Sequence, residues 1–107
     1  MKRVKILEVD FQRQVLDLAQ LKGWKSAHFR ALMDRRGRWS TPVQGDGAGF
    51  PDLLLIKGER LIAAELKSDT GTVAPAQHEW LQAFRNAGAE VFVWRPADLD
   101  QIQEALS

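Results

Sequence analysis

The chain has 107 residues, of which 45% are hydrophobic and 27% charged, and its formal net charge is +1 at pH 7. This length suits one domain over residues 1–107 with one hydrophobic core, and the composition is that of an ordinary globular protein. No apolar run approaches the ~20 residues that cross a bilayer, the N-terminus lacks a signal-peptide pattern, and without cysteine there are no disulfides or thiolate metal sites. We therefore expect a cytoplasmic protein.

The first two predicted elements each carry one ambiguous polar residue. Residues 6–22 favour an amphipathic helix that ends at Gly23, with Glu8 at the margin of its apolar stripe. Glu8 is either a charge that suits a helix N-terminus or an accessory acid of a site. Residues 24–29 alternate as a strand does, and His28 shares a face with Trp24. A structural role and a ligand role for His28 both stay open.

Residues 30–49 have neither helical nor strand periodicity, so we expect a long loop. Basic side chains with an interleaved tryptophan are typical of contacts to phosphates and a stacked base. A flap without such a role is the alternative. The candidate nucleic-acid contacts here are His28, Arg30, Arg35, Arg36, Arg38 and Trp39.

The stretch 49–67 reads as two apolar strands joined by the turn Gly58-Glu59. A two-residue turn sets the register, which pairs Leu55 with Ile62 and places Asp52 opposite Glu65. Lys67, two residues beyond Glu65, shares its face. Because both faces of this hairpin are apolar, we expect it in the middle of a sheet that is covered on both sides.

A helix is predicted from Pro75 to about Ala87, then a strand over residues 90–94 and a short helix from Pro96. The order α-β-β-β-α-β-α indicates an α/β fold, with a mixed sheet of about four strands and helices on both faces. The second helix should bury the stripe Trp80, Leu81, Phe84 and Ala87. Gln77 lies on that stripe near the carboxylates, where it either supports a site or caps the helix.

Asp52 and Glu65 facing each other would repel unless a cation lies between them. Paired carboxylates suit Mg²⁺ or Mn²⁺, which can neutralise a phosphodiester and lower the pKa of an attacking water. Lys67 alongside could orient that water or stabilise developing charge. The alternative is a surface ion pair of Glu65 with Lys67, and a turn capped by Asp52.

These residues resemble a known nuclease motif. Pro51-Asp52 followed by Glu65-Leu66-Lys67 matches PD-(D/E)XK, and GFPDLLL with AAELKSDTGTVAPAQ is similar to its VRR-NUC branch, which includes small stand-alone phage and bacterial proteins. The resemblance implies a restriction-endonuclease-like core, Asp52 and Glu65 as metal ligands, and Lys67 as the catalytic lysine. It implies supporting roles for Glu8 and Gln77, and the cytoplasm of a bacterial or phage-infected cell.

We therefore expect a Mg²⁺-dependent nuclease that hydrolyses DNA, selects structure (a junction or flap) rather than sequence, and accepts Mn²⁺ as a substitute. The resemblance also implies a homodimer, and cleavage that requires a helicase or recombination partner is a further possibility. The hypothesis from another class is a catalytically silent module that binds nucleic acid or a partner. Such a binder should keep its affinity in EDTA and lose it with salt.

Overall fold

The computed structural model describes residues 8–29, 32–33, 35–37, 39–40 and 45–107, with only the backbone described for residues 8, 9, 32, 33, 39 and 40. The helices are α1 (Glu8–Leu21), α2 (Pro75–Asn86), the 3-10 turn η1 (Pro96–Asp98) and α3 (Leu99–Ala105). The strands are β1 (Lys25–His28), β2 (Leu32–Met33), β3 (Trp39–Ser40), β4 (Leu53–Lys57), β5 (Arg60–Leu66) and β6 (Glu90–Trp94).

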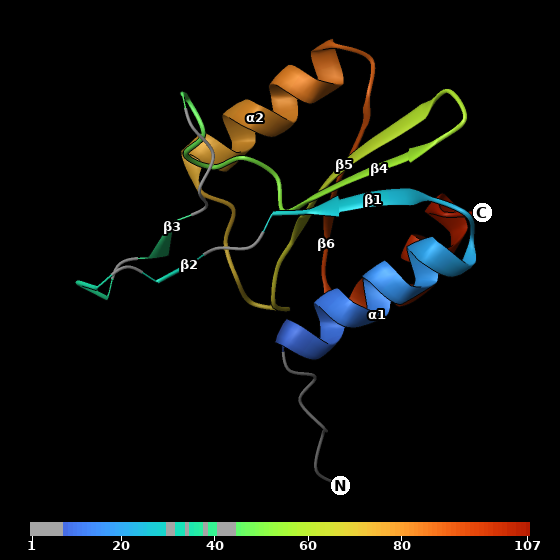
Figure 1. The fold of residues 1–107 in the computed structure, drawn as a ribbon, viewed down its shortest axis with the longest axis horizontal. Coiled ribbons are helices and arrows are strands. Elements are labelled where there is room, and N and C mark those ends of the chain that lie inside the picture. Colours follow the sequence, from blue (N-terminus) through green and yellow to red (C-terminus); the bar gives the residue numbers. More distant parts are fainter. Residues whose placement is uncertain (1–7, 30–31, 34, 38, 41–44) are drawn as a thin grey trace, which may run out of the picture.

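The α/β expectation is confirmed by a mixed four-stranded sheet in the order β1-β4-β5-β6. The β4–β5 hairpin is central and antiparallel, and its pair Leu55 with Ile62 has the register that the two-residue turn predicts. β6 runs parallel to β5, with Glu65 opposite Val93. Figure 1 shows α2 on one side of the sheet and α1 with α3 on the other.

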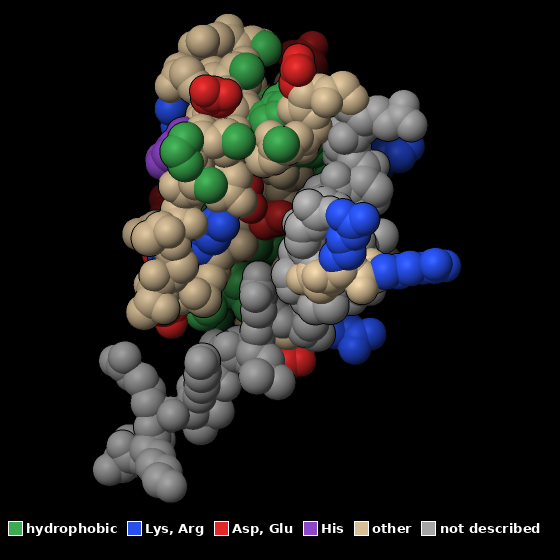
Figure 2. Space-filling model, turned by 90° about the vertical axis from the view of Figure 1, so that its left-hand side faces the viewer, with side chains coloured by type: hydrophobic (Ala, Val, Ile, Leu, Met, Phe, Trp, Pro, Cys, Tyr) green, Lys and Arg blue, Asp and Glu red, His purple; other side chains and the backbone are tan. Residues whose placement is uncertain are grey.

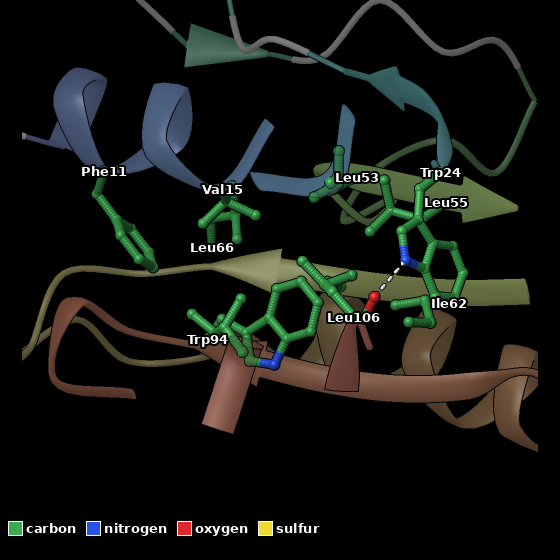
Figure 3. Close-up of a cluster of buried hydrophobic side chains, with 12 residues drawn as sticks. Phe11, Val15, Trp24, Leu53, Leu55, Ile62, Leu66, Trp94 and Leu106 are labelled. Carbon is green, nitrogen blue, oxygen red and sulfur yellow. Dashed lines mark hydrogen bonds between the residues drawn. The ribbon is translucent and has the colours of Figure 1, made fainter. Parts of the chain in front are cut away.

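The main hydrophobic core lies between the sheet and the helices α1 and α3 (Figure 3). Phe11 and Val15 of α1 are buried against Leu53 of β4 and Leu66 of β5, as their helical and alternating spacings require. Each such buried side chain contributes roughly 2 kcal/mol of transfer free energy. The core also contains Ala19, Trp24, Leu55, Ile62, Ala64, Trp94, Ile102 and Leu106.

Polar contacts also hold the C-terminal helix α3 and the residues that follow it against this core. The Trp24 Nε1 donates to the Leu106 carbonyl oxygen at 2.9 Å. Arg60 forms a salt bridge with Glu90 at 2.8 Å and donates to the Ala105 carbonyl oxygen at 2.8 Å. Because Arg60 and Glu90 lie on neighbouring strands, this pair joins β5, β6 and the end of α3.

The opposite face of the sheet is covered less completely than we expected. The helix α2 packs against β5 and β6, which leaves Ile56 at the end of β4 50% exposed. Within the predicted apolar stripe of α2, Leu81 is buried, Trp80 and Phe84 are half-buried, and Ala87 is exposed. The helical spacing is correct, but one helix is too narrow to cover a four-stranded sheet.

The expectation of an unstructured loop over residues 30–49 is wrong in part. β2 and β3 pair antiparallel, Leu32 with Ser40 and Met33 with Trp39, and the exposed residues 35–37 lie between them. Two-residue strands are too short to show periodicity, which explains why the sequence does not predict them. Within the part of the chain that the structure describes, no helix is long and apolar enough to span a membrane.

Candidate active site

Two carboxylates meet where β4 begins and β5 ends. The ladder pairs Leu53 with Ala64, so Asp52, one residue before β4, continues the register towards Glu65. The Leu66 backbone N–H donates to Asp52 Oδ2 at 2.9 Å. The Asp52 carbonyl oxygen accepts from the Phe29 N–H at 2.7 Å, which ties β1 to the same point. The Asp52 carboxylate is therefore held across the strand pair.

Glu65 is buried, with 1% of its surface exposed. Burial raises the pKa of Glu65 to about 9, because the charged form loses hydration. Burial is the largest cause of this rise; hydrogen bonding to Asp52 and the negative charge of Asp52 contribute to the same rise in pKa, whereas the positive charge of Lys67 opposes it. Without a cation, the pair therefore holds a proton at neutral pH.

Gln77 contacts both its own helix terminus and the buried acid. Its Oε1 accepts from the Ala74 N–H at 2.8 Å, and its Nε2 lies 3.4 Å from Glu65 Oε1 as a long hydrogen bond. One side chain thus caps the first turn of α2 and also lies at hydrogen-bond distance from the buried acid. Glu65 Oε2 is buried and has no hydrogen-bond partner among the described residues.

Lys67 follows β5 directly. Its backbone N–H donates to the Trp94 carbonyl oxygen at 2.9 Å, which continues the pairing with β6 beyond the strand. The Lys67 side chain is half-buried and close enough to act on the pKa of Glu65. Within the described residues its ammonium has no carboxylate at salt-bridge distance, so its three donors are left for another group.

The segment before Asp52 is packed onto the start of α2, which carries Gln77. Gly49 has a φ of +81°, and a Cβ there would lie 2.5 Å from the Ala76 carbonyl carbon. The Trp80 Nε1 donates to the Asp46 carbonyl oxygen at 2.8 Å, and the Phe50 and Trp80 rings meet edge to face with centroids 4.9 Å apart. Only glycine at position 49 allows the backbone to approach Ala76 this closely.

The carboxylate pair fits a divalent metal. Two adjacent carboxylates repel, Glu65 Oε2 lacks a partner among the described residues, and the Leu66 N–H orients Asp52. A bound cation would offset the repulsion and give Glu65 Oε2 a partner, and Mg²⁺ prefers few carboxylates plus water and phosphate oxygens. No group of three or more His, Cys, Asp or Glu side chains that could hold a metal occurs among the described residues.

The structure locates only some of the remaining predicted site residues. Glu8 is the first residue of α1, but its side chain is outside the described part, as is that of Trp39; Arg30 and Arg38 lie outside the described residues altogether. His28 is half-buried at the end of β1, and Arg35 and Arg36 are exposed between β2 and β3.

Figure 2 shows the left-hand side of Figure 1. Acidic side chains lie recessed near its centre, and Lys or Arg side chains lie on both sides of them. This distribution of charge suits a polyanion placed over an acidic centre that holds a cation.

Sequence reasoning missed the contribution of Gly49. A glycine two residues before Pro51-Asp52 is visible in the sequence. Its contact with Ala76 joins segments far apart in the chain, so no local pattern indicates it.

The comparisons with known proteins identify the family of the chain. The model of the VRR-NUC domain matches residues 30–98, which include Asp52, Glu65, Lys67 and Gln77. The chain belongs to the VRR-NUC family. As a VRR-NUC domain it falls within the PD-(D/E)XK nucleases, which confirms the resemblance of the sequence.

Among solved structures, the VRR-NUC chain is similar to Hjc, a Holliday junction resolvase from the archaeal hyperthermophile Archaeoglobus fulgidus. The TM-score is 0.54 at 21% identity, and the match covers 82% of this chain and 69% of that one. At this identity the likeness establishes the shared fold. No curated protein matches the sequence.

Proposed function

We propose that this VRR-NUC domain is a metal-dependent nuclease that hydrolyses DNA phosphodiester bonds. The observation that carries the proposal is the buried Glu65 carboxyl, beside Asp52 and within reach of the Lys67 charge, with Oε2 unpartnered among the described residues. Two abutting carboxylates that are removed from water destabilise a fold unless a proton or a cation offsets their charge, and a bound metal ion would supply such a cation.

Asp52 and Glu65 would hold Mg²⁺, with Mn²⁺ as a substitute. When bound, the metal supplies neutralisation of the phosphate charge and a water of lowered pKa. Lys67 donates hydrogen bonds to the attacking water or to the oxygens that gain charge in the transition state. Gln77 orients Glu65 through its Nε2 and ties that orientation to the first turn of α2.

We further propose that the substrate is selected by its structure, as a branched or flapped DNA. The similar archaeal protein is a Holliday junction resolvase, which supports a junction as the first substrate to test. A four-way junction offers two equivalent strands, and two copies of the chain would present two sites. We therefore propose a homodimer, so the mass by light scattering should be twice 12.1 kDa. A mass of one chain at working concentration would contradict the dimer.

The decisive experiment is cleavage of labelled duplex, single strand, 5′ flap and four-way junction with Mg²⁺, Mn²⁺ or EDTA. We expect metal-dependent cleavage that falls at least 10²-fold in Glu65→Ala and Lys67→Ala, since each removes charge stabilisation of the transition state. Asp17→Ala is the control, because Asp17 is an exposed acid in the middle of α1 and belongs to neither the carboxylate pair nor the connection after β5.

Retained cleavage in the Glu65 and Lys67 variants would contradict the assigned site. Absence of cleavage by the unmodified chain on all four DNAs, with DNA binding that survives EDTA, would contradict the nuclease and favour a silent binding module.

A further inference from the structure

The connection between β5 and α2, residues 67–74, is tied to the chain that follows β6. Arg95 Nη1 donates to the carbonyl oxygens of Ser68 and Gly71, both at 2.6 Å. The Ala97 N–H adds a third bond, to Asp69 Oδ1 at 3.1 Å. These bonds begin one residue after Lys67, so the anchor lies directly beside the lysine of the site.

Arg95 is itself well anchored. Its backbone N–H donates to Asp98 Oδ2 at 2.9 Å, where η1 begins, and its side chain is half-buried. A guanidinium presents several donors in one rigid plane, so it can hold two carbonyls at a set separation; a lysine ammonium is a single point on a flexible stem.

The connection also folds back towards the Lys67 side chain. The Gly71 N–H donates to Ser68 Oγ at 3.0 Å. A Cβ at Gly71 would lie 3.6 Å from Lys67 Cδ, so the backbone that Arg95 holds is adjacent to the lysine stem. A shift of this backbone would therefore change the position that the aliphatic part of the Lys67 side chain can occupy.

We propose that Arg95 is a positioning residue that sets the Lys67 ammonium relative to Asp52 and Glu65. This inference rests on the proposed function. It assigns Arg95 an effect on the rate of cleavage through the connection, without contact to DNA. The expected effect is on the order of tenfold or more in kcat, because misplacing a catalytic group by about 1 Å can cost ~10²-fold.

A direct phosphate contact is the rival role for an arginine in a nuclease, and kinetics separates the two. Loss of a positioning bond lowers kcat, and leaves KM for DNA and its dependence on salt unchanged. Loss of a phosphate contact raises KM and lowers the salt slope by about one.

The test compares Arg95→Met, Arg95→Lys and the control Arg85→Met, whose arginine lies exposed in the last turn of α2. Kinetics on the cleaved DNA is measured with Mn²⁺ affinity and with hydrogen exchange at the Gly71 amide. We expect Arg95→Met to show kcat at least tenfold lower, unchanged KM and Mn²⁺ affinity, and faster Gly71 exchange. Arg95→Lys should recover part of kcat, and Arg85→Met should match the unmodified chain.

A kcat that is unchanged in Arg95→Met, or a KM that rises with a lower salt slope, would contradict the positioning role of Arg95 but not the proposed nuclease activity. If Arg95→Met does not fold, Arg95→Lys decides, because it keeps the charge and most of the stem: a lower kcat with unchanged KM and salt slope supports the inference, and an unchanged kcat overturns it. If the unmodified chain cleaves none of the DNAs, both the proposed function and this inference are contradicted. Gly71 exchange would then report only whether Arg95 stabilises the connection between β5 and α2.

Discussion

Burying Glu65 beside Asp52 makes the stability of the fold depend on pH at the scale of a single residue. The pKa of Glu65 is raised from 4.5 to about 9 by burial and by Asp52. Between these values the folded state binds a proton that the unfolded state has lost. The contribution of the protonated Glu65 is therefore fully present below pH 4.5, and it is lost as the pH rises towards 9.

We predict that the metal-free melting temperature falls between pH 5 and pH 9, and falls less in Glu65→Gln, which cannot ionise. Mg²⁺ should raise the melting temperature more at pH 8.5 than at pH 6, because metal binding requires the deprotonated ligand. Thermal unfolding with and without EDTA measures both effects. Equal pH dependence in the two chains would show that Glu65 is not buried as a neutral acid.

At the scale of elements, the site depends on the contact between the segment before β4 and the start of α2. Gly49 allows this contact, since its φ of +81° and the position of Ala76 leave no room for a Cβ. Asp52 follows Gly49 in the chain and Gln77 follows Ala76. A disturbance here would therefore reach both sides of the carboxylate pair.

We predict that Gly49→Ala lowers both stability and cleavage. Gly88→Ala is the matched control, because Gly88 also has a positive φ (+97°) but no atom within 4 Å of the added Cβ. The control should lose about 1–2 kcal/mol from the left-handed conformation alone. Gly49→Ala should lose more, because its Cβ meets backbone at 2.5 Å. Urea unfolding gives the difference, and equal losses would show that the two segments are not packed together.

At the scale of the whole molecule, the basic and acidic groups are placed for a polyanion. The β2–β3 hairpin extends away from the sheet (Figure 1) and carries the exposed Arg35 and Arg36. A DNA strand lying over the carboxylate pair could extend to this hairpin. The proposed role of the hairpin is therefore binding of phosphates rather than chemistry.

We predict that the double variant Arg35→Ala/Arg36→Ala raises KM for DNA and lowers the slope of log KM against log salt by about two, with kcat unchanged. The control Arg13→Ala/Lys22→Ala removes two exposed charges on or beside α1, across the sheet from α2, and should leave both quantities unchanged. Equal effects of the two double variants would indicate a general effect of charge.

Much of the architecture follows from the sequence because it is set by local periodicity. The register of β4 and β5 follows from a two-residue turn and a period of two, and the family motif lies on this hairpin. The predicted site residues Asp52 and Glu65 meet for that reason. In contrast, β2 and β3 are too short for any period, and the exposure of Ile56 depends on how far α2 reaches across the sheet.

By itself, the sequence determined the α/β class, the central hairpin and the residues of the carboxylate pair, because these depend on spacing along the chain. The tertiary structure alone decided that Glu65 is buried with a raised pKa, that Gly49 packs on Ala76, and that Arg95 holds the connection after Lys67. The physical reason is that each of these depends on contacts between residues 13 or more apart in the chain, whose distances and burial no local pattern encodes.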